Sequence, residues 1–148
     1  MASRLPVPSI SEARTTLRAA GMRATPCRVA VIQFLSRHKA PTSHQEVCLE
    51  LEERGFDKST IFRTLNDLAE SGLAHRMELG DHVWRYELTA VGDQSAHAAG
   101  QLHPHLLCTA CGGITCLSSR QVQVSILETI GEISEILLKG RCRHCLSN

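Results

Sequence analysis

Two C-x-x-C pairs near the end of the chain place the strongest constraint on what this sequence can fold into. The first pair is Cys108 and Cys111, followed by Gly112, and the second is Cys142 and Cys145. Each C-x-x-C turn brings two thiolates onto one compact loop, and two such turns complete a tetrahedral zinc shell with Zn–S distances of about 2.3 Å. One pair alone is also the motif of thiol–disulfide oxidoreductases, but no βαβ pattern accompanies either pair. We therefore predict a structural Zn²⁺ bound by all four cysteines.

The composition agrees with a structural metal site that stabilises the fold. The chain has 148 residues and seven cysteines, and only 3% of its residues are aromatic. The segment 102–148 is too short for a sizeable core of its own, so its folding should depend on the metal.

Cys27 and Cys48 lie in amphipathic helical patterns and are interpreted as packing residues. No apolar stretch is long enough to span a membrane and no secretory signal is evident, so we expect a cytoplasmic protein.

The first half of the chain has the pattern of a winged helix. Apolar periodicity and capping residues predict helices over residues 11–20, 26–37, 43–54 and 58–71, with Ser11 capping the first. Two alternating runs, 73–79 and 82–88, are separated by Gly80-Asp81, which is typical of a β-hairpin. Helices followed by a hairpin predict a DNA-binding domain of the winged helix-turn-helix type over residues 1–89.

The helix predicted over 58–71 has two distinct faces. Its apolar stripe, spaced for packing against a core, is Ile61, Leu65, Leu68 and Ala69. The opposite stripe carries a hydroxyl, an aromatic ring, a guanidinium and a carboxamide, on Ser59, Phe62, Arg63 and Asn66. These groups suit base edges, thymine methyl groups and phosphates. The alternative is an ordinary solvated face with Phe62 turned into the core.

The second half of the chain has a different pattern of residues and predicted elements. A small-residue stretch, 90–101, is predicted to be a linker or hinge, and 102–148 a small α/β dimerisation domain with the four-cysteine zinc site. Short strands predicted at 106–108, 113–117 and 133–139 flank a helix predicted from Ser119 to Ile130. The whole chain is thus predicted to be of the α+β class.

Histidines suggest a second metal site. The chain has eight, and His103 and His105 are spaced so that both rings lie on one face of a strand, where they can share a metal. Glu87 closes the predicted hairpin and His75 lies near its start. For an isolated histidine, a surface or hydrogen-bonded role is the simpler interpretation.

Four motifs in order resemble those of the ferric-uptake-regulator superfamily. They are Gly-Met-Arg-Ala-Thr-Pro-Cys-Arg at 21–28 (G-x-R-x-T-P-Q-R in the family), Ser-Thr-Ile-Phe-Arg-Thr-Leu at 59–65 (T-V-Y-R-x-L), the H-x-H-L-x-C-x-x-C-G block at 103–112, and the closing pair at 140–145. The resemblance as a whole extends over residues from about 11 to 145, nearly the whole chain.

The resemblance implies a non-enzymatic homodimer that binds a palindromic, A·T-rich operator in double-stranded DNA. Phe62 stands in the place of a tyrosine that contacts thymine, and Arg63 in the place of a phosphate contact. The full set of DNA-binding residues that we expect is Arg23, Ser59, Thr60, Phe62, Arg63 and Asn66. No small-molecule substrate and no membrane partner are expected.

The resemblance also implies a regulatory metal at the hinge. By position, Glu87, His103 and His105 match three ligands, while the family's usual fourth, a histidine, falls at Ala40. The candidates for the fourth ligand are His75, as in the zinc-uptake-regulator branch, and then Cys116, His44 and His38.

The expected function is repression of metal homeostasis genes in response to metal. Cys116 is a soft donor that favours Zn²⁺ over Fe²⁺ or Mn²⁺ at the hinge. The family's second sensing site is expected to be absent, because Leu102, Pro104 and Ser134 occupy its positions, so we predict two metals per chain. The alternatives are an iron-responsive or peroxide-sensing regulator and, more remotely, a C-x-x-C oxidoreductase. Ala40 disfavours peroxide sensing, because it replaces a histidine that such sensors oxidise.

Overall fold

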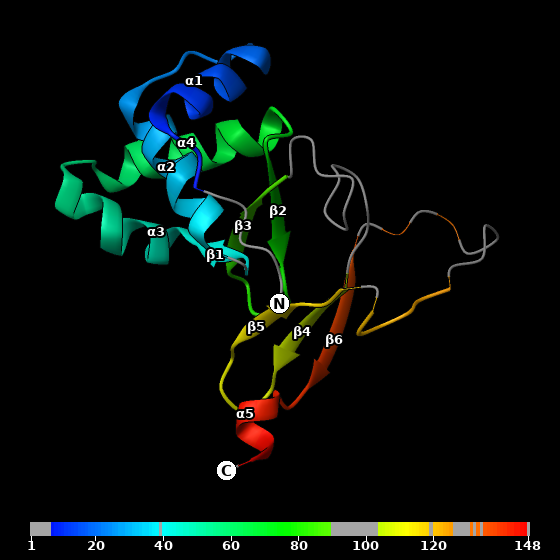
Figure 1. The fold of residues 1–148 in the computed structure, drawn as a ribbon. Helices are drawn as coiled ribbons and strands as arrows, with labels where there is room; N and C mark the ends of the chain where they lie inside the picture. Colours follow the sequence, from blue (N-terminus) through cyan, green and yellow to red (C-terminus); the bar gives the residue numbers. More distant parts are fainter. Residues whose placement is uncertain are drawn as a thin grey trace. The chain divides into compact units, whose positions relative to one another are not determined.

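The computed structural model describes residues 7–38, 40–89, 104–118, 120–125, 131, 133 and 135–147. The chain divides into two compact units, Met1–Val91 and Gly92–Asn148, and each is described by itself (Figure 1). The predicted linker, 90–101, lies outside the described residues. No described helix is both long enough and apolar enough to cross a membrane.

The described part of the first unit contains four α-helices. They are α1 (Ile10–Ala19), α2 (Pro26–Arg37), α3 (His44–Leu51) and α4 (Lys58–Glu70), with the short 3-10 turn η1 (Glu52–Arg54) after α3. All four helices were predicted within about two residues at their starts.

The helix caps explain these boundaries. Ser43 forms a capping box with Glu46 at the start of α3, and Asp57 accepts the Thr60 N–H at the start of α4. The prediction of Ser11 as the first cap is wrong: Ser9 caps α1. The reason is that Glu12 then falls at the third helical position, where its carboxylate can accept the Ser9 N–H and close a capping box.

A small antiparallel sheet completes the first unit. It contains β1 (Thr42–Ser43), β2 (Ala74–Glu78) and β3 (Trp84–Leu88) in the order β1-β3-β2. The strands β2 and β3 form the predicted hairpin, whose turn uses left-handed backbone at Gly80 (φ 84°) and His82 (φ 60°). The two-residue β1 was not predicted from the sequence. The helices α2, α3 and α4 followed by this hairpin form the winged helix-turn-helix arrangement.

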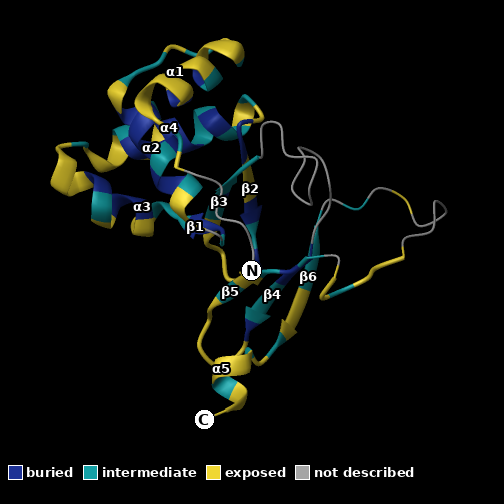
Figure 2. Ribbon diagram, viewed as in Figure 1, coloured by how far each residue is buried: buried dark blue, intermediate teal, exposed yellow. Residues whose placement is uncertain are grey.

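The core of the first unit lies between the helices and the sheet. Its fully enclosed members include Leu17, Val31, Leu51, Ile61 and Leu65. In Figure 2 the buried residues follow the inner faces of α2 and α4. Cys27 and Cys48 are buried here too, at 5% and 3% exposure, and burial raises the pKa of both thiols. Their predicted packing role is confirmed.

Among its described residues, the second unit contains a three-stranded sheet followed by one helical turn. Its elements are β4 (Pro104–Cys108), β5 (Ile114–Cys116), β6 (Ile136–Gly140) and α5 (Arg143–Leu146). The central strand β4 pairs antiparallel with β5 and parallel with β6.

The helix predicted from Ser119 to Ile130 is wrong in its first half. Residues 120 and 121 form a turn and 122–125 have no regular structure, while 126–130 lie outside the described residues. Gln121 and Val122 donate their N–H groups to the Ser118 carbonyl, which closes an isolated turn. The β-branched Val122 and Val124 have lower helix propensity and favour extended backbone, so the turn does not propagate into a helix.

Candidate metal centres and nucleic-acid interface

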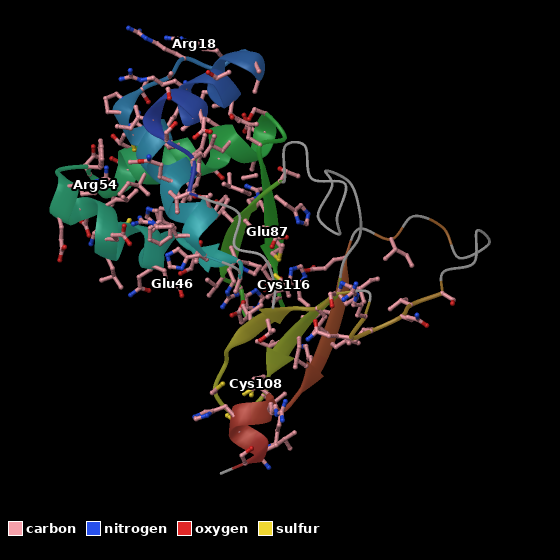
Figure 3. All side chains as sticks on the ribbon, in the orientation of Figure 1. Arg18, Glu46, Arg54, Glu87, Cys108 and Cys116 are labelled. Carbon is pink, nitrogen blue, oxygen red and sulfur yellow. The ribbon has the colours of Figure 1, made fainter. Side chains whose placement is uncertain are left out.

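The second unit brings the four cysteines of the two C-x-x-C pairs together. Their sulfur atoms lie within 4.8 Å of one another, and Figure 3 marks the cluster at Cys108. Cys108 ends β4 and Cys142 follows β6. The parallel register of these strands places Cys108 opposite Gly140, so both pairs meet at the same end of the sheet.

The donor geometry of this cluster fits zinc. The sulfurs of Cys111 and Cys142 are 3.9 Å apart. A tetrahedral ion at the usual Zn–S distance would separate two sulfurs by about 3.8 Å. The sulfurs are therefore already spaced for one four-coordinate ion, which Cys108, Cys111, Cys142 and Cys145 would hold.

Backbone groups support the sulfurs. The Cys142 N–H donates to the Cys108 sulfur at 3.3 Å, and the Thr109 N–H donates to the Gly140 carbonyl at 2.8 Å. Gly113 leaves necessary space, since a Cβ there would lie 3.3 Å from the Cys111 sulfur. Outer contacts of this kind orient metal ligands.

The cluster also shifts the acidity of its thiols. Backbone N–H groups, that of Cys142 first, lower the pKa of Cys108 to about 6. Hydrogen bonds with the sulfurs of Cys142 and Cys111 raise the pKa of Cys145 to about 12. Cys108 therefore loses its proton more readily than Cys145, and a bound divalent cation would favour the thiolate form of its ligands.

A second pair of soft donors lies on the sheet of the same unit. The β4–β5 register sets His105 opposite Cys116, and a ring nitrogen of His105 lies within 4.8 Å of the Cys116 sulfur. His105 is only 2% exposed. The other histidine of the predicted pair, His103, lies outside the described residues.

In the first unit, the hairpin brings together two more of the predicted ligands. His75 on β2 is opposite Glu87 on β3, and the His75 Nδ1 is 4.0 Å from a Glu87 carboxylate oxygen. Both side chains therefore lie on one face of the hairpin. Figure 3 labels Glu87 and Cys116 on their respective strands.

The other two candidate ligands have partners among the helices. The His38 ring stacks on Phe34 with centroids 4.2 Å apart. The His44 Nε2 lies 3.0 Å from the Lys58 carbonyl oxygen and 3.1 Å from the Cys48 sulfur. The structure thus places His38 and His44 in contacts within the helical layer.

The predicted DNA-reading face of α4 is exposed at its centre. Phe62 is 47% exposed, which excludes the alternative that its ring is turned into the core. Arg63 and Ser59 are exposed beside it, and the Arg63 Nε donates to the Ser59 carbonyl at 3.3 Å. Arg23, which precedes α2, is exposed as well.

Two hydroxyls of the predicted DNA-binding set are used in capping α4. Ser59 and Thr60 each donate to the Asp57 carboxylate at 2.5 Å. Together with the Thr60 N–H, these donors hold the pKa of Asp57 well below its usual range. Ser59 and Thr60 therefore fix the start of the helix that carries Phe62.

Asn66, by contrast, is hydrogen-bonded to the hairpin. Its carbonyl oxygen accepts hydrogen bonds from the Tyr86 hydroxyl at 3.0 Å and from Arg76 Nη1 at 3.2 Å. Sequence reasoning missed Arg76 and Tyr86, because alternation along a strand indicates which residues share a face but not which helix that face meets.

Known proteins share both the sequence pattern and the fold of this chain. The model of the "Ferric uptake regulator family" matches residues 19–134. The ferric uptake regulation protein of Bacillus subtilis is 28% identical over 150 residues, covering 92% of this chain and 93% of the relative. The zinc uptake regulation protein of Mycobacterium tuberculosis (strain CDC 1551 / Oshkosh) is 28% identical over 141 residues, covering 88% and 100%.

Two solved structures share the fold. A ferric uptake regulator from Francisella tularensis with iron has a TM-score of 0.64 at 23% identity, covering 85% of this chain and 96% of that one. A zinc uptake regulator complexed with zinc and DNA has a TM-score of 0.62 at 20% identity, covering 93% of each chain. Both likenesses concern the fold alone.

Proposed function

The chain belongs to the ferric uptake regulator family, and on this basis we propose that it is a zinc-responsive transcriptional repressor that binds operator DNA as a homodimer. Its regulated genes would be those of metal homeostasis. The observation that carries the DNA-binding part is the two-sided character of α4. Ile61 and Leu65 are fully buried on one side, while Phe62 and Arg63 are exposed on the other.

This exposed face suits the major groove. An α-helix fits that groove, and an aromatic ring can contact the methyl group by which thymine is distinguished. Phe62 would make that contact, and Arg63 would bind an adjacent phosphate. Arg23, Ser59 and Thr60 would lie at the edge of the same interface, as the family motifs imply. A dimer presenting two such helices would recognise a palindromic operator, for which we propose an A·T-rich sequence.

For the regulatory metal we propose Glu87, His103 and His105 as ligands, following their match to the family positions. His75 and Cys116 are the preferred candidates for the fourth, since His75 lies beside Glu87 and Cys116 beside His105. His38 and His44 are weaker candidates, because each has a contact in the helical layer.

Zinc is favoured over iron by donor chemistry. Thiolate and imidazole together favour zinc, whereas a site of oxygen donors favours harder cations. Cys116 would supply the thiolate next to the His105 imidazole. The curated relatives do not decide the metal, because the ferric and the zinc regulation proteins are equally similar to this chain, at 28% identity each.

The proposed regulation is a shift in population. Ligands on either side of the predicted hinge, 90–101, would restrict the wing and its helix α4 to the spacing that DNA requires. Converting a mostly incompetent population to a mostly competent one needs a preference of about 10⁴-fold, or roughly 5.5 kcal/mol. Several metal–ligand bonds at one site are sufficient for an effect of this size.

Native mass spectrometry before and after mild chelation tests the proposal. We expect a dimer with two zinc ions per chain, of which the hinge ion is lost first. One tight zinc per chain would contradict zinc sensing, and a protein without zinc would contradict the proposal as a whole.

DNA binding is tested with a duplex enriched from a randomised pool by the zinc-loaded protein. Replacing His103 and His105 together by alanine should abolish zinc-dependent binding and leave the ion of the four-cysteine site in place. His82→Asn is a matched control, because His82 lies in the exposed hairpin turn with a positive φ that asparagine accommodates. If the double variant still responded to zinc, the hinge site would be wrong. If Fe²⁺ replaced zinc as the required ion, the iron-responsive alternative would take its place.

A further inference from the structure

Arg76 and Trp84 form an exposed pair on the hairpin that no role assigned so far uses. Arg76 lies in β2 and is exposed, and Trp84 begins β3 with 49% exposure. The guanidinium carbon of Arg76 is 4.4 Å from the centroid of the Trp84 ring, which is within the range of a cation–π contact. The ring therefore holds the arginine against the hairpin surface.

The strand register determines which way this pair faces. Arg76 is opposite Tyr86 in the β2–β3 pairing, and Trp84, two residues before Tyr86, lies on the same face of the sheet. Tyr86 is buried, and its hydroxyl donates to Asn66 of α4 at 3.0 Å. The face that carries Arg76 and Trp84 is thus the face that packs against α4.

Asn66 joins the arginine to that helix. Its carbonyl oxygen accepts from Arg76 Nη1 at 3.2 Å as well as from Tyr86, and its amide donates to the Phe62 carbonyl at 3.2 Å. With both ends of its side chain engaged within the protein, Asn66 is better suited to positioning Arg76 than to reading a base. Arg76 is held one side chain away from the exposed face of α4.

The charge of Arg76 is available to an anion. The neighbouring arginine, Arg85, donates to both carboxylate oxygens of Asp81, at 2.9 and 2.6 Å. Glu78, opposite Trp84, accepts the His82 N–H. Within the part of the chain that the structure describes, no carboxylate forms a salt bridge with Arg76.

We propose that Arg76, stacked on Trp84, binds a backbone phosphate of DNA beside the groove entered by α4, so that the hairpin is a second DNA contact. The inference rests on the proposed DNA-binding function. A guanidinium is suited to this role because its planar fork matches the geometry of a phosphate and stacks on an aromatic face at the same time. Such a contact fixes the register of the protein on the duplex and is independent of base sequence.

The test compares Arg76→Gln with wild-type protein, both zinc-loaded, by fluorescence anisotropy over a range of salt concentrations. The probes are the enriched duplex and a duplex of the same length with that sequence scrambled. Glutamine retains an amide donor but removes the charge. We expect affinity to fall roughly tenfold, and the slope of log K against log salt to become shallower by about 0.9 per protomer. The slope should change equally on both duplexes.

Two further variants keep the test decisive. Arg120→Gln makes the same substitution at an exposed arginine of the second unit and should leave affinity and slope unchanged. Arg76→Lys retains the charge and should keep the wild-type slope, while affinity falls because an ammonium group lacks the planar fork. Trp84 is the only tryptophan of the chain, so its emission should change when wild-type protein binds DNA, and change less in Arg76→Gln.

Several results would overturn the inference. One is an unchanged salt slope in Arg76→Gln while wild-type protein binds DNA. Another is the same slope loss in Arg76→Lys as in Arg76→Gln, since that would show a structural rather than an ionic role. If wild-type protein bound neither duplex, the DNA-binding proposal itself would fail, and that outcome is distinct from both of these.

Discussion

In the first unit, α2 and α4 pack Val31, Ile61 and Leu65 into a core with no solvent exposure. In the second unit, the buried residues among those described are Pro104, His105, Cys108 and Leu117. Burying one large aliphatic side chain contributes about 1.5–3 kcal/mol to folding. The first unit has many such side chains. Among the described residues of the second unit, few aliphatic side chains are buried.

The first unit is stabilised by an apolar core, and for the second we propose that a structural zinc ion contributes in its place. A structural zinc site contributes apparent free energies on the order of 10 kcal/mol to folding, comparable with several buried leucines. With zinc bound by its four cysteines, the second unit would therefore need fewer buried apolar side chains. The helical unit instead uses its interior for stability and keeps the outer face of α4 exposed.

Removing the structural zinc should have the largest effect of any change considered. In Cys111→Ser, or after strong chelation, we expect the second unit to unfold, because its remaining apolar core is too small. Helical circular dichroism from α1 to α4 should persist. Limited proteolysis would check this, with new cleavages in 104–147 and protection of 7–89. If both segments were protected from proteolysis without zinc, the proposed stabilisation of the second unit by zinc would be contradicted.

A core truncation should act on the first unit instead. Leu65→Ala removes a fully buried side chain of α4 and should lower the free energy of unfolding by about 2–5 kcal/mol. Urea unfolding followed by circular dichroism measures this loss. Leu49→Ala is the matched control, since Leu49 is 69% exposed and should change stability by less than about 0.5 kcal/mol. The zinc content should not change in either variant, and a loss of zinc would show that the units are coupled.

The first helix cap offers a smaller test. Ser9→Ala should cost about 1 kcal/mol, because it removes the side chain that accepts the Glu12 N–H at the start of α1. Ser11→Ala lies inside the helix, where alanine is favoured, and should be neutral or slightly stabilising. Thermal unfolding of the two variants side by side gives the answer. A larger loss in Ser11→Ala would support the cap first predicted from the sequence.

The smallest effect concerns the ion pair in the hairpin turn. Hydrogen bonds from Arg85 lower the pKa of Asp81 from 3.8 to about 2. A carboxylate with a lowered pKa stabilises the folded state above its unfolded pKa, and this contribution is lost as pH falls through the folded pKa. Asp81→Asn should therefore cost less than about 1 kcal/mol at neutral pH. The difference from wild type should disappear between about pH 4 and pH 2, as followed by Trp84 emission. A difference that persisted at pH 2 would exclude the ionic cause.

Local patterns predicted much of the first unit. Apolar spacing and capping residues are properties of short segments, so α2, α4 and the β2–β3 hairpin followed from the sequence directly. The errors occurred where two local signals compete, as at Ser9 and Ser11, or where a short apolar pattern fits more than one structure, as at 120–125. The pairing of β4 with β6 joins segments about 30 residues apart along the chain, and no local pattern specifies such a pairing.

The two C-x-x-C pairs, the order of helices and hairpin, and the residues of α4 available to face solvent all follow from the amino-acid sequence. These features depend on the chemistry of one turn or on the period of one helix. Which residues meet across elements is known only from the folded units. Folding brings the four sulfurs to the spacing of one ion, places His105 beside Cys116, and turns Asn66 toward Arg76 and Tyr86. These contacts between elements depend on strand register and on helix packing. Both are determined by the free energy of the whole folded unit rather than by any single segment.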